Sequence, residues 1–149
     1  MRPFVLLRRV HVDEAIALYQ RLYEVGRHRR PPGRGSYAWM FERGERWAIA
    51  CIPLDNLVFQ TWFESSPESR ARAEQYASLP TALPPGVASY AEGTRARARR
   101  SAKAWVQDGN HRVLAAEIRN QDCALMLMPE GEVRALRRDD RRRMTPARR

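Results

Sequence analysis

Apolar positions in residues 12–25 recur every three to four residues, which is the spacing of one face of an α-helix. Asp13 and Glu14 stand in the first turn, where carboxylates favour the positive end of the helix dipole. Gly26 follows the pattern and is a common helix stop. The sequence therefore predicts a helix over residues 12–25. Its apolar face comprises Ile16, Tyr19, Leu22 and Tyr23.

Three shorter apolar segments have the length of strands. Residues 47–54 form a continuous apolar run, which is typical of a strand buried on both faces, and Pro53 is expected to end it or place it at an edge. The pattern of residues 57–63 does not distinguish a strand from a helix. Residues 87–90 predict a short strand.

A second helix is predicted from its start signal. Ser66 is a good N-cap, Pro67 suits the first helical position, and Glu68 stands near the helix dipole. We expect this helix to run to about Leu79, before the breakers of residues 80–86.

Residues 104–128 contain a strand–turn–helix–strand pattern. A strand at 104–106 leads into the polar turn 108–112, a helical pattern follows, and residues 123–128 form another apolar strand. A right-handed crossover would make the two strands parallel and place the turn at the carboxyl end of the first strand, where ligands bind in such sheets.

These elements predict an α/β or α+β fold with helices packed on a small mixed sheet. A chain of 149 residues fits one domain, and its 44% hydrophobic content excludes disorder throughout. We divide it into an N-terminal helix and basic loop (1–46), a core (47–129) and a basic C-terminal tail (130–149) that frays at its end.

The formal net charge is +10, and both ends are basic whereas the centre is acidic. Strong positive charge favours nucleic acid, nucleotides or other anions as partners. Lys103 is the single lysine among 27 basic residues, so the codon bias of a GC-rich genome explains the arginines equally well. The densest internal basic run is residues 93–103.

Neither a membrane span nor a signal peptide is expected. No apolar run approaches about 20 residues, and Arg8 and Arg9 interrupt the apolar N-terminus. Cys51 and Cys123 lie in apolar strand-like runs, and we interpret them as buried thiols in a reducing cytoplasm, with a disulfide as the alternative.

Most aromatic residues are interpreted as core. Trp105, beside the polar turn, is expected to be buried or to line a pocket. The expected core aromatics are Trp39, Phe41, Trp47, Phe59, Trp62 and Phe63.

The turn Asp108-Gly109-Asn110-His111-Arg112 carries the strongest chemical signal. The first N–H groups of a helix are unpaired within it and its dipole favours an anion there. The positive charges of His111 and Arg112 would destabilise the helix, because they stand at the positive end of its dipole. A phosphate bound there would make their interaction favourable. The purely structural alternatives are a turn at Asp108-Gly109 and a helix cap at Asn110.

In this turn the chain resembles the ParB/sulfiredoxin-like superfamily, including ParB-like nuclease domains. Members show a strand, a turn of the type Asp-Gly-x-His-Arg, an Ala-rich helix and a strand, which correspond here to 104–128 with Ala115-Ala116. Residues 52–57 resemble the opening strand and turn of that domain, so the resemblance covers about 47–129. It implies a small α/β fold that holds nucleotide phosphates at the helix start.

The chain departs from each subgroup. Asn110 stands where sulfiredoxin needs a Cys, so peroxiredoxin repair is not expected. Residues 130–149 resemble neither the second Arg-rich box nor the helix-turn-helix domain of partition proteins, so a full clamp is not expected. The related serine kinase needs a catalytic Glu, for which Glu42, Glu45 and Asp55 are candidates.

The expected site combines these lines. Asp108 and His111 are the candidate catalytic residues, and no Cys/His spacing predicts a zinc site. Arg99 and Lys103 are further candidates for phosphate contact. The principal candidates for phosphate binding are Gly109, Asn110, His111, Arg112 and Arg100.

The leading functional hypothesis is a cytoplasmic domain that binds a nucleotide or nucleic-acid phosphate, with ATP, ADP or CTP and Mg²⁺ as possible cofactors. If it is an enzyme, it is a nuclease or a nucleotide-dependent phosphotransferase. The alternatives are a non-catalytic DNA-binding module that uses its basic termini and a degenerate domain kept for protein interaction.

Overall fold

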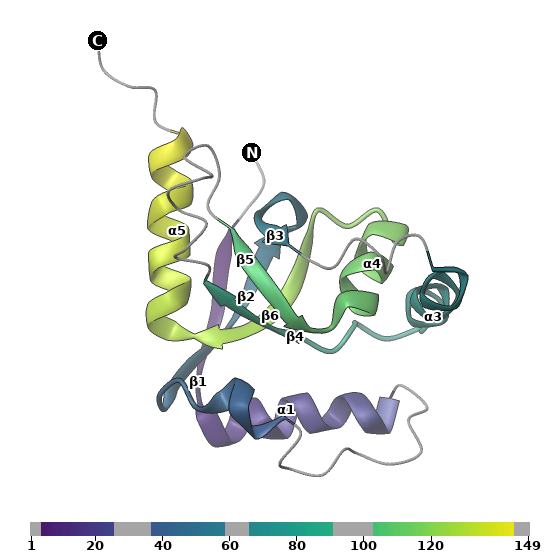
Figure 1. The fold of residues 1–149 in the computed structure, drawn as a ribbon, viewed down its shortest axis with the longest axis horizontal. Helices are drawn as coiled ribbons and strands as arrows, with labels where there is room; N and C mark the ends of the chain where they lie inside the picture. Colours follow the sequence, from purple (N-terminus) through teal and green to yellow (C-terminus); the bar gives the residue numbers. More distant parts are fainter. Residues whose placement is uncertain (1–3, 26–36, 59–65, 91–102, 145–149) are drawn as a thin grey trace.

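A computed structural model describes residues 4–25, 37–58, 66–90 and 103–144. Figure 1 shows the helices and strands in chain order. The strands are β1 (Val5–His11), β2 (Arg46–Pro53), β3 (Leu57–Val58), β4 (Gly86–Tyr90), β5 (Ala104–Asp108) and β6 (Cys123–Pro129). The α-helices are α1 (Val12–Val25), α3 (Pro67–Ala77), α4 (Asn110–Ile118) and α5 (Glu130–Met144), and the 3-10 helices are η2 (Ala38–Phe41) and η3 (Leu54–Asn56).

The local predictions for the helices and most strands are confirmed. Helix α1 covers residues 12–25, and β2, β4, β5 and β6 lie where apolar runs placed them. The Ser66 hydroxyl accepts a hydrogen bond from the Ser69 N–H at 3.4 Å, so it caps α3 as expected. Of the segment 57–63, residues 57–58 form β3, and the others lie outside the described residues.

The described strands form one mixed sheet in the order β1-β2-β6-β4-β5-β3. Pairs β1/β2, β2/β6 and β4/β5 are antiparallel, whereas β4/β6 and β3/β5 are parallel. A mixed α/β fold is therefore shown.

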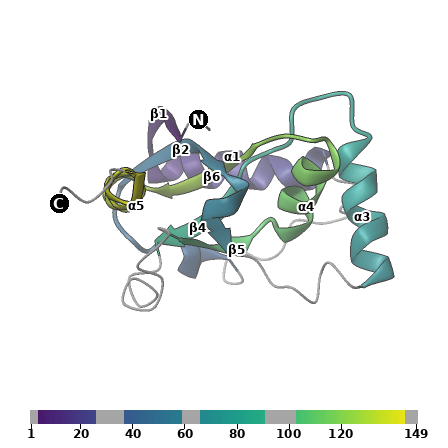
Figure 2. The same ribbon diagram turned by 90° about the horizontal axis from the view of Figure 1, so that it is seen from above.

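The predicted parallel βαβ unit is wrong. Strand β4 lies between β5 and β6, and it runs parallel to β6 but antiparallel to β5. Because β5 and β6 run in opposite directions, α4 leaves and re-enters the sheet at the same end and needs no crossover. It instead lies beside α3 at the end of the molecule opposite α5 (Figure 2).

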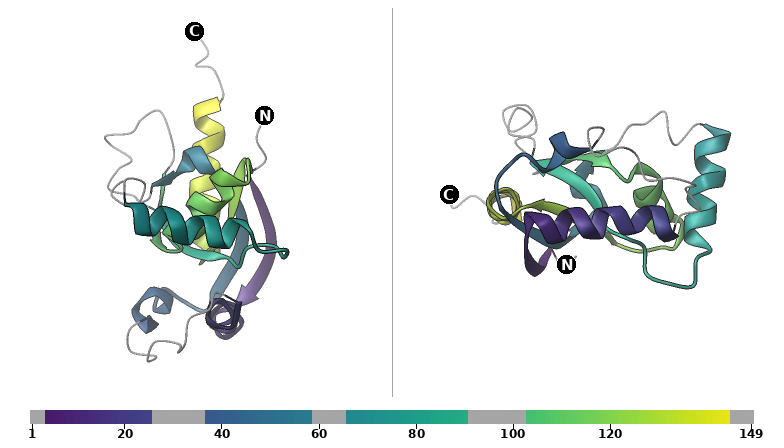
Figure 3. Two further views of the ribbon diagram at one scale, coloured as in Figure 1. Left: turned by 90° about the vertical axis from the view of Figure 1, so that its right-hand side faces the viewer. Right: turned by 90° about the horizontal axis from the view of Figure 1, so that it is seen from below.

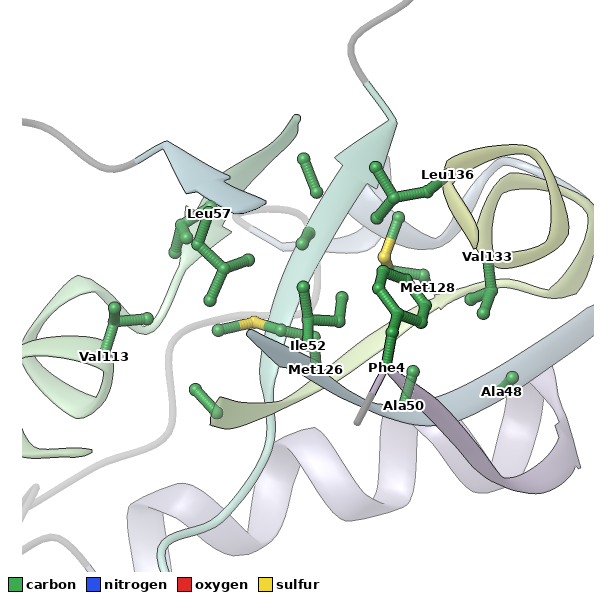
Figure 4. Packing of buried hydrophobic residues seen from close by; sticks show 14 of the residues in the cluster. Phe4, Ala48, Ala50, Ile52, Leu57, Val113, Met126, Met128, Val133 and Leu136 are labelled. Carbon is green, nitrogen blue, oxygen red and sulfur yellow. The ribbon is translucent and has the colours of Figure 1, made fainter. Parts of the chain in front are cut away.

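The two faces of the sheet are covered by different helices. Alternation along β2 sends Ile52 toward a cluster with α4 and α5, and Trp47 toward a cluster with α1 and η2. Figure 4 shows Ile52, Met126 and Leu136 packed in the first cluster. Figure 3 shows α1 lying across the sheet on the other side.

Segments near both ends of the chain belong to the folded domain, although the sequence pattern does not predict them as strand or helix. Strand β1 is not predicted by the hydrophobic pattern, yet it pairs with β2 along its length. Residues 130–144, interpreted as part of a basic tail, form α5, whose Val133 and Leu136 are fully buried in the core. Among the described residues, no helix combines the length and the apolar character that a membrane span requires.

The expectation of free thiols is wrong. Cys51 and Cys123 form a disulfide, with their Cα atoms 5.7 Å apart. Antiparallel pairing of β2 with β6 brings together residues that are 72 positions apart in the sequence, so no local pattern could reveal the bond. The disulfide removes the thiol argument for a reducing compartment.

The aromatic predictions are confirmed only in part. Phe41 and Trp47 are buried, but Trp39 and Trp105 are 54% and 44% exposed. Trp105 faces outward on β5 because its neighbours Ala104 and Val106 take the core positions of that strand. Phe59, Trp62 and Phe63 lie outside the described residues.

Candidate phosphate-binding site

The polar turn joins the end of β5 to the start of α4. Gly109 is the residue before the helix and has φ = 104°, a left-handed conformation that favours glycine. Its carbonyl accepts hydrogen bonds from the N–H groups of Arg112 and Val113, both at 3.0 Å. A Cβ at Gly109 would lie 3.0 Å from the Gly86 Cα and from Arg112, so the start of β4 packs directly against this turn.

Arg112 points inward from the first turn of α4 and is only 4% exposed. Its Nη1 donates to the carbonyl oxygen of Pro85, with the Pro84 oxygen at 3.5 Å. Its Nη2 lies 3.8 Å from Oδ1 of Asp108. Arg112 therefore ties α4 to the segment that leads into β4, and its guanidinium orientation is fixed.

Asp108 also connects elements. Its Oδ2 accepts a hydrogen bond from the Tyr19 hydroxyl of α1, while Oδ1 faces Arg112. One carboxylate thus joins α1, β5 and α4. These contacts give Asp108 a positioning role at the turn.

The other expected residues are distributed unevenly. Asn110 and His111 are half-buried in the first turn of α4, so the turn brings them together with Gly109. Lys103 precedes β5, roughly 16 Å of strand from Asp108, and donates to the Asp55 carbonyl oxygen. It is not part of this group, and Arg99 and Arg100 lie outside the described residues.

None of the three candidates for the catalytic Glu of the serine kinase lies on β5, on the turn 108–112 or on α4. Glu42, Glu45 and Asp55 are exposed, and they lie on the segments before and after β2. Within the described part of the chain, no three His, Cys, Asp or Glu side chains gather as a metal site would require.

A cavity of about 370 Å³ opens beside Arg112. Its wall combines Arg112 and Ala116 of α4, residues 82–84 before β4, and residues 121–126 at the start of β6. Cys51 completes the lining, so the disulfide forms part of the wall. Arg112, Gln121 and Asp122 are polar, and most of the remaining lining is apolar.

Sequence reasoning finds Arg112 but misses the rest of this cavity. The pattern of residues 80–86 indicates only helix breakers, whereas Pro84 lines the cavity and Pro85 holds Arg112. The available signal is the unusual Pro84-Pro85-Gly86 run directly before a strand. Residues 121–126 join it only through the sheet order, which no local pattern encodes.

Comparison of the chain with protein-family models, curated proteins and solved structures found no match.

Proposed function

We propose that this protein is a ParB/sulfiredoxin-like domain that binds the phosphate of a nucleotide at the start of α4, with the rest of the ligand in the adjoining cavity. The observation that carries the proposal is Arg112, a side chain from the first turn of α4 that is 4% exposed and forms part of the cavity wall. A planar guanidinium held in one orientation suits phosphate oxygens, which it can contact in pairs.

The backbone supports the same assignment. Gly109 follows β5 in a left-handed conformation and starts α4 directly after the strand. The positive end of the helix dipole and the Arg112 charge act on one region. His111 and Asn110, half-buried in that turn, supply further polar groups.

The cavity fits a small ligand with a charged end. Its volume of about 370 Å³ lies in the range of small-molecule sites. The apolar residues 123–126 suit a base or sugar, while Arg112 suits the phosphate. ATP, ADP and CTP, each with Mg²⁺ carried by its phosphates, are the ligands to test.

The geometry refines the proposed roles. Asp108 positions Tyr19 and Arg112 and is therefore a weaker candidate for a general base than the sequence suggests. His111 is the titratable side chain in the first turn of α4 and is the candidate for proton transfer if phosphoryl transfer or nuclease activity accompanies binding.

Titration of the full chain with ATP, ADP, CTP and inorganic phosphate, with and without Mg²⁺, tests the proposal by calorimetry. We expect His111→Ala to weaken nucleotide binding about tenfold, or about 1.4 kcal/mol. Arg112→Lys keeps the charge but loses the paired donors, and we expect a loss of similar or greater size.

His11→Ala is the matched control, because His11 is exposed on β1 and belongs neither to the turn 108–112 nor to the cavity lining. Its nucleotide affinity should equal that of the wild-type chain, and thermal unfolding should verify that every variant is folded. The proposal fails if none of these ligands binds the wild-type chain at low salt, or if His11→Ala and His111→Ala weaken binding equally.

A further inference from the structure

Three of the four acidic side chains of α5 lie on a different side of the helix from its described arginines. Between Glu130 and Arg141 it carries four carboxylates and four arginines, so its described side chains carry no net charge. Each carboxylate contacts another part of the protein or its own helix. The charged groups on the outer face of α5 are therefore mainly arginines.

Two of the carboxylates hold the sheet. Glu132 accepts hydrogen bonds from the Arg43 guanidinium at 2.7 and 3.0 Å and from the Tyr90 N–H at 2.8 Å. Asp139 accepts a hydrogen bond from the Tyr90 hydroxyl. Both therefore face β4.

The other two carboxylates are nearly buried. Asp140 is 9% exposed and accepts a hydrogen bond from the Asn56 amide at 2.9 Å. Glu130 is 7% exposed and pairs with Arg9 of β1 at 2.7 Å and with Arg134 at 2.6 Å. All four negative charges are thus turned toward the domain or matched by an arginine.

The described arginines form one stripe along the helix, with Glu130 at its N-terminal end. Arg134, Arg138 and Arg141 are exposed and Arg137 is half-buried, at the spacing i, i+3, i+4 and i+7 of a single helical stripe. Among the described residues, no carboxylate lies within ion-pairing distance of Arg137 or Arg138. Figures 1 and 2 show α5 at one end of the molecule, away from α3 and α4.

From this arrangement we propose that the outer face of α5 binds the phosphate backbone of duplex DNA. The stripe spans about 10 Å along the helix, over which one strand of a duplex presents about three phosphates. Arginine forks match phosphate oxygens in pairs, and the contacts would carry no base specificity.

A lipid surface fits this face less well. Within the described side chains of α5, Val133 and Leu136 are fully buried, so the arginine stripe has no large apolar side chain to insert. The arginine stripe also lies away from the proposed nucleotide cavity, which is built from α4 and the start of β6. Each of the two proposals can therefore be disproved without affecting the other.

Fluorescence anisotropy with a labelled duplex of about 20 base pairs tests the proposal across a salt series from about 50 to about 200 mM. Since Arg134 is paired with Glu130, three arginines remain to neutralise phosphates, and wild-type affinity should fall roughly fortyfold over that range. In Arg137→Ala/Arg138→Ala the logarithmic salt slope should drop by about two, leaving a fall of roughly threefold.

Arg21→Ala/Arg70→Ala is the matched control, because it removes the same charge from two exposed arginines on α1 and α3. This control should keep the wild-type slope, and duplexes of unrelated sequence should bind equally. Nucleotide titration of the α5 variant should match that of the wild-type chain.

Three results would overturn the proposal. One is no duplex binding by the wild-type chain at about 50 mM salt. Another is an equal loss of salt slope in Arg21→Ala/Arg70→Ala, which would show that binding depends on the overall positive charge and not on α5. The third is binding to anionic phospholipid vesicles that depends on Arg137 and Arg138 and exceeds binding to the duplex.

Discussion

At the scale of single residues, Gly109 is constrained both by its backbone conformation and by its neighbours. Its φ of 104° already disfavours any side chain, and the space beside it is taken by the Gly86 Cα and the Arg112 guanidinium. Gly86 is equally confined, because a Cβ there would lie 2.8 Å from the Asp108 carbonyl oxygen. The candidate site therefore depends on two glycines that let two turns touch.

We predict that Gly109→Ala lowers the free energy of unfolding by about 2–4 kcal/mol, from the left-handed backbone together with displacement of Arg112. Gly44 shares a positive φ of 102°, but a Cβ there would meet no atom within 4 Å, so Gly44→Ala should cost only about 1 kcal/mol. Urea unfolding measures the free energy of unfolding of both variants. Equal losses would show that the close packing around Gly109 does not contribute to stability.

Gly131 provides a control of opposite sign. It lies in the first turn of α5 with open space around it, so Gly131→Ala should leave stability unchanged or raise it by up to about 1 kcal/mol. A loss comparable to that of Gly109→Ala would point to a general intolerance of alanine.

At the scale of elements, Arg43 contacts five parts of the fold, namely α5, β4, β5, η2 and β2. Its guanidinium donates to Glu132 of α5, to the Ala88 carbonyl of β4 and to the Gln107 side chain of β5. It also donates to the Met40 carbonyl of η2 and stacks 5.2 Å from the centre of the Trp47 ring. Burial lowers the pKa of Arg43, and the charge and hydrogen bonds of Glu132 oppose that shift.

Replacing Arg43 by Ala should therefore destabilise the protein by about 2–3 kcal/mol, because a half-buried carboxylate and two sheet acceptors lose their donor. Arg43→Lys should recover only a minor part, since an ammonium cannot reach all these acceptors together. Arg46→Ala, at an exposed position of β2, should stay within about 0.5 kcal/mol of wild type in urea unfolding. Similar losses for Arg43→Ala and Arg46→Ala would contradict this assignment.

The elements also show what the sequence can and cannot predict. Helix α1, the Ser66 cap and the start of α4 are predictable because their signals are local. Strand β1 escapes prediction because Arg8 and Arg9 hide its apolar alternation, and α5 does so because ten charged residues surround Val133 and Leu136. Sheet order, the disulfide and the cavity depend on contacts between distant segments.

At the scale of the whole molecule, the disulfide closes a long loop. Cys51 and Cys123 are 72 residues apart, and a link of that length restricts the unfolded chain strongly. We predict that Cys51→Ala/Cys123→Ala lowers the free energy of unfolding by up to about 4 kcal/mol. Wild-type protein treated with dithiothreitol should approach the variant in urea unfolding, whereas the variant should not respond to it. Detection of two free thiols in the untreated native protein by a thiol-reactive reagent would contradict the presence of the disulfide.

The position of β6 has a consequence for how the chain folds during its synthesis. It is the last of the described strands to emerge from the ribosome, yet it lies between β2 and β4 and joins the paired strands β1 and β2 to the other three strands. Until residues 123–129 are made, the two halves of the sheet have no shared hydrogen bonds, and each exposes an apolar edge. The domain is therefore completed late, by insertion of its central strand, and nascent chains that end before β6 are the species most exposed to aggregation.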